Sequence, residues 1–161
     1  MPTLLFTTDI LAPVEELFLF HTDTNNLELI TPLEISVGIE SIVGEGKGSI
    51  ITLRMRALGL IRSRWVIEIA EFEPPHRIVD LQLSGPFKFF RHSRTFTSLG
   101  EDTSRLEDML EYELPLGIIG RIANALFFRG LISRQFAYRH KQTHAILDQY
   151  EDEVIEELQE H

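Results

Sequence analysis

The spacing of apolar and polar residues changes twice along the chain. Between Leu33 and Leu114, apolar and polar positions alternate with a period of two, which is typical of half-buried strands. The pattern predicts about six consecutive strands joined by hairpins. Turn-forming residues interrupt this region at Gly44 to Gly48, Gly59, Pro74-Pro75, Gly85-Pro86 and Gly100 to Thr103.

The flanking regions have the patterns of one further strand and three helices. Leu4 to Ile10 is apolar and β-branched, as in a strand, and Pro13 favours a helix start at Val14 to His21. Asp23 to Ile30 predicts a second short helix. Ile118 to about Tyr150 has a helical period, which predicts one long helix of about nine turns.

The predicted order is therefore strand, two short helices, six strands and a long helix. Each strand has one more apolar face, so one side of the sheet must be covered. One long C-terminal helix can provide that cover, and its apolar start from Ile118 to Phe128 is expected to pack on the sheet. We predict an α+β fold in which a curved antiparallel sheet of about seven strands (β-α-α-β6-α) wraps around this helix.

Composition and charge limit the classes to which this protein can belong. A length of 161 residues with 43% hydrophobic and 25% charged residues is typical of one globular domain, which we place at residues 1–150. The formal charge is −10, and residues 151–161 are predicted to form an acidic tail. Residues 1–147 lack the basic stripe of a nucleic-acid-binding protein, so nucleic acid is not an expected partner.

Several features point to a cytoplasmic protein without a membrane span. Cysteine is absent, which excludes disulfides and thiolate chemistry. Met1 to Phe18 contains Asp9, Glu15 and Glu16 where a secretory signal needs an unbroken apolar run. The apolar stretch from Ile118 to Phe128 is far shorter than the ~20 residues that cross a bilayer. The oligomeric state stays open.

The element order and several local strings resemble the START-like superfamily, often called SRPBCC. It includes polyketide cyclase/dehydrase-like, coenzyme Q-binding and Bet v 1-like proteins. The resemblance covers residues 3 to about 147. It is carried by Ala12-Pro13-Val14 with Phe18 and Phe20, His21-Thr22-Asp23 through Leu27 to Thr31-Pro32, Trp65-Val66-Ile67 with Pro74-Pro75, Val79-Asp80, Gly85-Pro86-Phe87, His92 with Phe96, Asp108 with Tyr112, Leu114-Pro115-Leu116-Gly117, Gly120, and Phe136 with Arg139.

The resemblance implies a helix-grip fold, with a cavity between the concave face of the sheet and the long helix. It looks closest to bacterial stand-alone members that are described as ligand-binding or cyclase/dehydrase-like. It supplies no catalytic motif. The superfamily places lipid carriers, hormone receptors and cyclases on one scaffold, so the fold does not specify the function.

Asp108 is a carboxylate on the apolar face of the last predicted strand, between Leu106 and Leu110. A buried carboxylate needs a cation or hydrogen-bond donors, or else a raised pKa. Strand parity sets Arg94 of the preceding strand opposite Asp108, and His92 beside it. The strand before that one adds Asp80 and Gln82, so these five polar side chains are predicted to form one network.

Three interpretations of this network stay open. It can be a structural ion-pair network that holds the strands in register. It can line the cavity and orient a polar group of a ligand. It can also perform acid/base catalysis, with His92 as the proton shuttle, Asp80 or Asp108 setting its tautomer, and Arg94 beside them.

The predicted ligand-binding set joins this network to apolar residues of the strands and of the helix start. For Trp65 and Tyr112, plain core packing is favoured over direct contact with a ligand. The full set is Trp65, Ile67, Asp80, Gln82, Phe90, His92, Arg94, Phe96, Asp108, Leu110, Tyr112, Ile122 and Leu126.

Two further patterns are not expected to form a metal or phosphate site. His140, His144 and Asp148 have the spacing of metal ligands on a helix, but the polar residues around them predict a solvated helix face. Gly44 to Gly48 predicts a hairpin turn rather than a phosphate loop, because no helix follows it, although a role in gating the cavity stays open. We expect no metal and no cofactor.

The sequence thus leaves three functional hypotheses. The first is a non-enzymatic protein that binds or carries a small hydrophobic ligand such as a lipid, an isoprenoid or a polyketide-like compound. The second is a cyclase or dehydratase that uses the His/Asp/Arg cluster on a polyketide-like substrate. The third is an interaction module whose apolar helix start contacts a protein or, transiently, a membrane surface.

Overall fold

The structure is a computed structural model that describes residues 1–57 and 59–159. It has the predicted α+β class and the predicted order of elements. The strands are β1 (Thr3–Ile10), β2 (Ile35–Val43), β3 (Ile50–Ala57), β4 (Ile61–Glu73), β5 (Arg77–Ser84), β6 (Phe89–Ser98) and β7 (Ser104–Glu113). The helical segments are α1 (Val14–Thr22), the 3-10 turn η1 (Thr24–Leu27), α2 (Gly117–Ala123), the π-helical turn η2 (Asn124–Phe128) and α3 (Arg129–Gln159).

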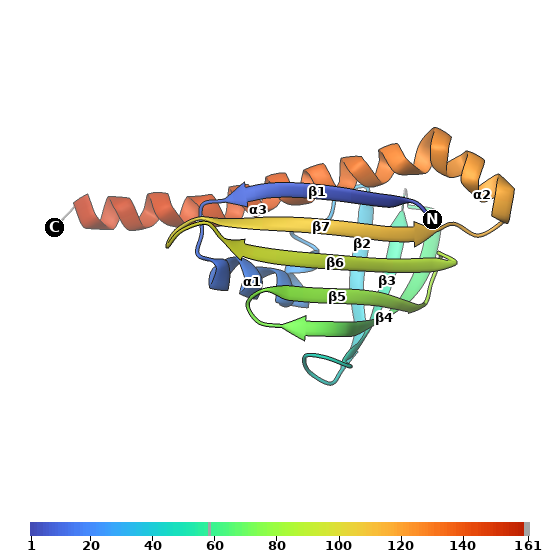
Figure 1. Ribbon diagram of the computed structural model, residues 1–161, viewed down its shortest axis with the longest axis horizontal. Coiled ribbons are helices and arrows are strands. Elements are labelled where there is room, and N and C mark those ends of the chain that lie inside the picture. The colour runs from blue at the N-terminus through green and yellow to red at the C-terminus, as the bar shows by residue number, and fades with distance from the viewer. Residues whose placement is uncertain (58, 160–161) are drawn as a thin grey trace.

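The seven strands form one antiparallel sheet in the order β1-β7-β6-β5-β4-β3-β2. β2 and β3 run steeply across the direction of β1, β7 and β6, so the sheet is strongly curved (Figure 1). The register shifts between Ile39 and Ser41 in β2 and between Ile69 and Glu71 in β4. Such bulges bend a strand and increase its twist, which gives the sheet its concave face.

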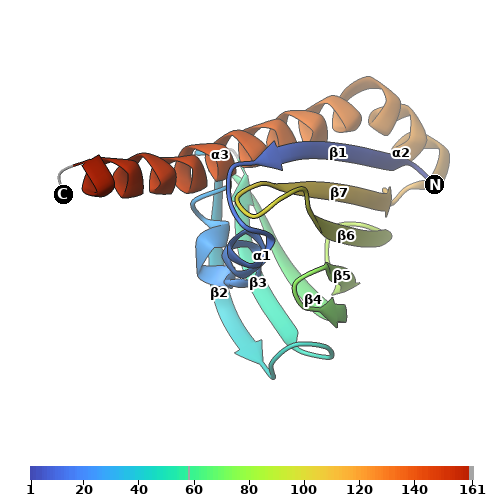
Figure 2. The same ribbon diagram turned by 60° about the vertical axis from the view of Figure 1, so that its left-hand side comes forward.

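The long C-terminal helix and α1 cover the concave side. α3 runs alongside β1 in both ribbon views (Figures 1 and 2), and α1 packs on β6 and β7. The helical region predicted from Ile118 to Tyr150 is interrupted by the π-helical turn, where the Tyr112 hydroxyl donates to the Asn124 side chain. α3 continues to Gln159, so most of the predicted tail is helical, whereas Glu160 and His161 lie outside the described residues.

Most of the apolar start of the helical region does not pack on the sheet, so that prediction is wrong except at Phe128, which packs against Phe87. Ile122 is 56% exposed and Leu126 is 67% exposed. Ile118, Ile119 and Phe127 are also exposed. We define Leu116, Ile118, Ile119, Ile122, Leu126 and Phe127 as the α2 apolar surface. In the part of the chain that the structure describes, no helix has the length and hydropathy of a bilayer-spanning segment.

Among the residues whose burial the structure describes, the core consists of three clusters. The largest joins α1 to β6 and β7 through residues such as Phe18, Phe96 and Leu106. The second, around Tyr112, Phe90 and Phe136, joins the sheet to α3. The third contains Val37, Leu53 and Ile67 on β2, β3 and β4. Because the buried side chains do not merge into one block, space remains between the clusters.

Candidate functional site

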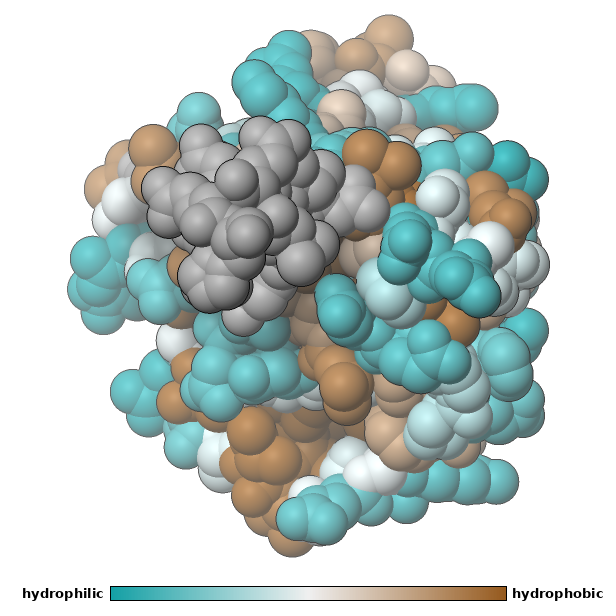
Figure 3. Space-filling model, turned by 90° about the vertical axis from the view of Figure 1, so that its left-hand side faces the viewer, coloured by the Kyte–Doolittle hydropathy of each residue, from teal (hydrophilic) through white to brown (hydrophobic). Residues whose placement is uncertain are grey.

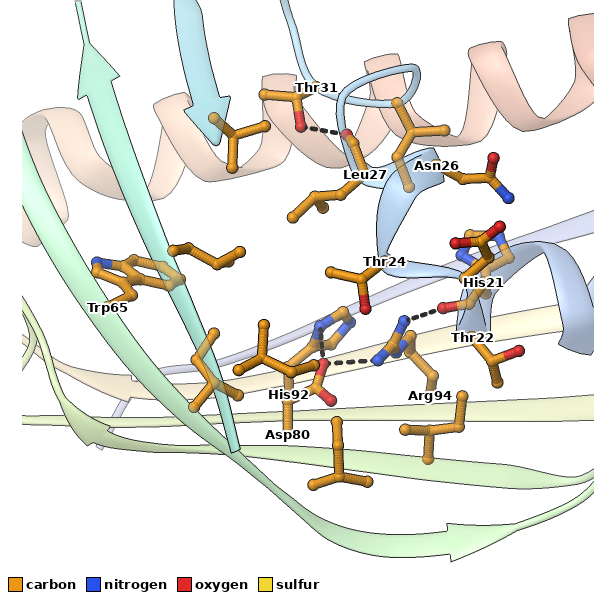
Figure 4. Close-up of a pocket in the computed structure, with 18 of the residues that line it drawn as sticks. His21, Thr22, Thr24, Asn26, Leu27, Thr31, Trp65, Asp80, His92 and Arg94 are labelled. Carbon is orange, nitrogen blue, oxygen red and sulfur yellow. Dashed lines mark hydrogen bonds and ion pairs between the residues drawn. The ribbon is translucent and has the colours of Figure 1, made fainter. Parts of the chain in front are cut away.

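A cavity of about 440 Å³ lies between the concave face of the sheet and α3. Strands β2 to β7 contribute to its wall, α3 adds Ile132, Gln135, Phe136 and Arg139, and the segment from Phe20 to Pro32 adds another side. Figure 4 shows part of this lining, with His92, Asp80 and Arg94 on one side of the space and Trp65 apart from them. The cavity is therefore amphipathic, with a polar side and an apolar side.

The apolar side is built from aromatic and aliphatic side chains of the strands. The ring centroids of Trp65 and Phe90 are 5.0 Å apart, and those of Trp65 and Phe87 are 5.5 Å apart. Leu53 and Ile67 line the same region. Strand alternation explains this wall, because residues two apart on β3 and β4 point to the same face.

The cavity reaches the surface beside η1 and the turn between β2 and β3. Asn25 and Glu45 both line the cavity and are exposed to solvent. The turn that carries Glu45 is the glycine-rich segment Gly44 to Gly48. Viewed from the side of the C-terminal end of α3, hydrophobic residues form a band between polar ones on the surface (Figure 3).

Arg94 holds the polar side of the cavity together. Its Nη2 atom donates to Asp80 Oδ2 at 2.7 Å, and its Nη1 atom donates to the main-chain oxygen of His21 at 2.9 Å (Figure 4). The guanidinium thus joins β5 and β6 to the end of α1. Asp80 Oδ1 and Arg94 Nε are buried without a hydrogen-bond partner among the described residues.

Asp108 lies behind this side, at 4% exposure, and accepts two hydrogen bonds from histidines. His92 Nε2 is 2.6 Å from Asp108 Oδ1, and His140 Nε2 is 2.7 Å from Asp108 Oδ2. Burial raises the pKa of Asp108, but the hydrogen bonds from His140 and His92 outweigh it and hold the pKa well below its ordinary value. Asp108 is therefore ionised at neutral pH.

His92 lies between the carboxylates of Asp80 and Asp108. Burial lowers the pKa of His92 and outweighs the hydrogen bond to Asp108, so the ring is neutral at neutral pH. A neutral imidazole has one N–H, and the ionised Asp108 requires it on Nε2. Nδ1 then carries the lone pair and lies 3.7 Å from Asp80 Oδ2, which is too far for a hydrogen bond.

His21 is a second buried histidine beside the cavity. Burial lowers its pKa to about 3, and the attraction of Asp108 only partly offsets that effect. Its Nδ1 atom has no partner in the described part of the protein, and Nε2 is 3.5 Å from the Thr143 hydroxyl. His21 is therefore neutral, and it positions Arg94 through its main-chain oxygen.

The structure places about half of the predicted ligand-binding residues at the cavity. Their role in binding stays a prediction. Residues that line the cavity are Trp65, Ile67, Asp80, Phe90, His92, Arg94 and Leu110. Residues of the predicted set that do not line it are Gln82, Phe96, Asp108, Tyr112, Ile122 and Leu126.

The residues outside the cavity have other partners. Gln82 leaves the predicted network, because its side-chain amide bonds the main chain of Phe87. Phe96 packs against Phe18 in the largest core cluster. Asp108 supports the cavity wall through His92. Ile122 and Leu126 were wrongly expected at the cavity, since they point to solvent.

His140 and His144 do not form the solvated helix face that we predicted. His140 bonds Asp108, while His144 bonds Thr8 on β1 at 2.8 Å and Asp148 at 2.9 Å. Both histidines thus attach α3 to the sheet. Sequence reasoning missed His140 and Arg139 as site residues, although their four-residue and three-residue spacings from Phe136 put all three near one helix face.

Comparison with solved structures identifies the fold. A protein from Thermus thermophilus has a TM-score of 0.72 and 23% identity over 89% of this chain and 95% of its own. A START superfamily protein from Mycobacterium smegmatis has a TM-score of 0.67 and 17% identity over 92% of this chain and 98% of its own. The Zhui aromatase/cyclase from Streptomyces sp. R1128 has a TM-score of 0.73 and 14% identity over 91% and 93%.

These similarities confirm the helix-grip fold that the sequence predicted. At these identities they define the fold alone. No protein-family model and no curated protein sequence matches this chain.

Proposed function

We propose that this helix-grip protein binds a small amphipathic, largely hydrophobic molecule in the cavity between its sheet and α3. The observation that carries the proposal is the cavity itself. Its volume of about 440 Å³ lies within the ~300–1,000 Å³ of typical small-molecule sites. Its wall combines a broad apolar region with a few convergent polar groups, which is the usual composition of such sites.

The organisation of the core supports the same function. Three clusters of buried side chains surround the space, and none of them fills it. The cavity also reaches solvent beside η1, which gives a ligand an entrance. Some solved proteins of this fold are described as a START superfamily protein and an aromatase/cyclase, which fits a scaffold for holding organic molecules.

A neutral dye tests the proposal directly. Nile red should gain fluorescence on titration into the protein, and mass spectrometry of organic extracts should detect a retained hydrophobic compound. Met55 lines the cavity, so Met55→Trp should fill it and weaken dye binding at least about tenfold. Met109→Trp is the matched control and should leave dye binding unchanged. Met109 lies on β7 between the inward residues Asp108 and Leu110, so its side chain is on the opposite face of the sheet.

Two results would refute cavity binding. The first is a protein that neither retains a hydrophobic compound nor binds Nile red. The second is dye binding that Met55→Trp leaves unchanged, since the dye would then lie elsewhere.

The tautomer of His92 favours a second candidate function, proton transfer in a cyclase or dehydratase reaction. With Nε2–H bonded to Asp108, Nδ1 of His92 has a free lone pair beside the cavity. A base oriented by a carboxylate in this way can take a proton from a bound substrate. His92→Gln should then abolish turnover of an identified substrate while Nile red binding persists. Unchanged turnover would exclude this role.

We also infer that the α2 apolar surface contacts an anionic lipid membrane. Six large apolar residues on this surface are exposed together, and Phe127 reaches 74% exposure. From Pro115 to Leu147 the sequence contains five basic residues and no acidic one, although the whole chain has a charge of −10. Exposed Arg121 lies among the apolar residues in the sequence, and exposed Arg129 follows them. Apolar side chains with flanking arginines are suited to a bilayer that carries negative charge.

Sedimentation with vesicles tests this contact. Binding should be stronger to phosphatidylcholine vesicles that contain phosphatidylserine than to pure phosphatidylcholine, and salt should weaken it. The double variant Ile118→Ser/Phe127→Ser should lose binding. Leu33→Ser/Leu60→Ser removes two apolar residues elsewhere that are even more exposed, and it should keep the binding. Equal binding by both double variants, or self-association through this surface in place of vesicle binding, would overturn the inference.

A further inference from the structure

Arg139 is a guanidinium on the polar side of the cavity that comes from α3. Its Cζ atom lies 5.3 Å from the centroid of the Phe136 ring, and that ring is edge-on to His92 at 5.3 Å. Arg139 and Phe136 both line the cavity. The charged group therefore faces the same space as the cluster of Asp80, His92 and Arg94.

Arg139 lacks the partners that the other arginine of the site has. Arg94 bonds both Asp80 and the main-chain oxygen of His21. Within the described residues, Arg139 forms no side-chain hydrogen bond and has no carboxylate within 4.0 Å. Its five N–H donors are unmatched, although burial of the side chain lowers its pKa. The side chain is half-buried and none of its nitrogens is among the fully buried atoms without a partner, so these donors are accessible to an acceptor that enters the cavity.

The nearby carboxylates do not supply that acceptor. Asp108 uses both oxygens for His92 and His140. Asp80 Oδ2 is bonded to Arg94, and its Oδ1 atom is buried without a partner among the described residues. Both carboxylates attract Arg139 only from beyond contact distance. The space next to the Arg139 guanidinium is therefore open to a group that enters with a ligand.

We propose that the ligand is an amphipathic carboxylic acid whose carboxylate is bound by Arg139 and whose hydrocarbon or aryl part lies against Trp65 and Phe90. A carboxylate matches the planar guanidinium with two parallel hydrogen bonds, which an alcohol or a ketone cannot form. The aromatic wall supplies apolar contact for the rest of the molecule. The proposal rests on the proposed function and specifies the class of ligand.

The experiment compares two molecules that differ only in the head group. Dodecanoic acid and 1-dodecanol are used to displace Nile red from the protein at a pH of about 7.5, where the acid is ionised. The acid should displace the dye at a concentration about 10–100-fold lower, as expected for hydrogen bonds to a charged group. Arg139→Met should bring the acid to the level of the alcohol and leave the alcohol unchanged. Arg139→Lys should retain part of the preference, because it keeps the charge without the planar donors.

Arg134→Met provides the control, since Arg134 is an exposed arginine on the same helix and does not line the cavity. It should leave the acid preference intact. Equal displacement by acid and alcohol from the unmodified protein would overturn the proposal for Arg139 and leave the proposed function standing. Failure of both compounds to displace the dye, in a protein that also retains no hydrophobic compound, would count against the proposed function itself. The comparison on the unmodified protein decides the question even if Arg139→Met does not fold.

Discussion

Asp108 on β7 and His140 on α3 are joined by a hydrogen bond of 2.7 Å between Oδ2 and Nε2. The other oxygen of Asp108 bonds His92, whose ring lines the cavity. One buried carboxylate thus connects the C-terminal helix, the centre of the sheet and the cavity wall. This connection is one of the contacts that hold α3 over the cavity, together with the bond from His144 to Thr8.

Asp108→Asn should lower the free energy of unfolding by about 2–3 kcal/mol. The amide keeps one acceptor oxygen, but its NH₂ group meets the N–H of one of the two histidines. Denaturation in guanidinium chloride measures the loss. Asp9→Asn is the control, because Asp9 pairs with Arg105 at the surface, and it should change stability much less. If Asp108→Asn is as stable as the parent, desolvation of the buried charge cancels its hydrogen bonds.

Stability should fall as the pH falls below about 6.5, the ordinary pKa of histidine. His21 has an ordinary pKa of 6.5 in the unfolded chain and a pKa of about 3 in the folded protein, because burial disfavours the charged ring. Burial also lowers the pKa of His92. At a pH below about 6.5 and above the lowered pKa values, the two rings bind protons in the unfolded chain but not in the folded protein. The free energy of unfolding is therefore constant above a pH of about 6.5 with respect to these groups, and below it falls by up to ~1.4 kcal/mol per pH unit for each ring.

Unfolding curves at several pH values between about 7.5 and about 4.5 check this slope. His21→Phe keeps an aromatic ring beside Phe96 and should remove the contribution of His21. His76→Asn changes an exposed histidine on the turn before β5 and should retain the full slope. A slope that is the same in the His21→Phe variant as in the parent would show that His21 is not buried and neutral.

Two glycines of the C-terminal helical region should respond oppositely to alanine. A Cβ atom at Gly120 would lie too close to the main-chain oxygen of Pro115, so Gly120→Ala must displace the start of α2 and should destabilise the protein by about 1–3 kcal/mol. At Gly130, apart from its chain neighbours and the backbone of its own helix, no atom lies within 4 Å of the added Cβ. Gly130→Ala should stabilise α3 by about 0.5–1 kcal/mol through helix propensity. Thermal unfolding of the two variants gives the signs, and equal signs would contradict this packing.

Much of the sheet could be predicted from local sequence patterns. Period-two alternation and turn residues placed the strands, and parity set Arg94 opposite Asp108, as the structure has them. The sequence also put Asp80 beside His92 and Arg94, and the structure pairs it with His92. These relations depend on neighbouring hairpins, in which the length of the turn determines the register. Gln82 is not part of the observed network, because its side-chain amide donates a hydrogen bond to the main-chain oxygen of Phe87 in the adjacent turn.

The contacts of the helix could not be predicted in the same way. The pairing of Asp108 with His140 depends on how α3 is rotated over the sheet, which no local pattern determines. The π-helical turn at Asn124–Phe128 adds to the difficulty, since one extra residue turns the following helix by about 100°. The helical stripe that contains Ile122 and Leu126 therefore does not continue toward the sheet. Nothing in the spacing of these residues indicates such a turn.

The division of the core into three clusters implies that the strands differ in how readily they open. The cluster of Val37, Leu53 and Ile67 is the smallest, so backbone amides of β2 and β3 should exchange their hydrogens sooner than those of β6 and β7. A molecule in the cavity would touch Leu53 and Ile67 and add the contacts that these strands lack. Slower exchange in β2 and β3 would then report occupancy of the cavity without any label on the guest.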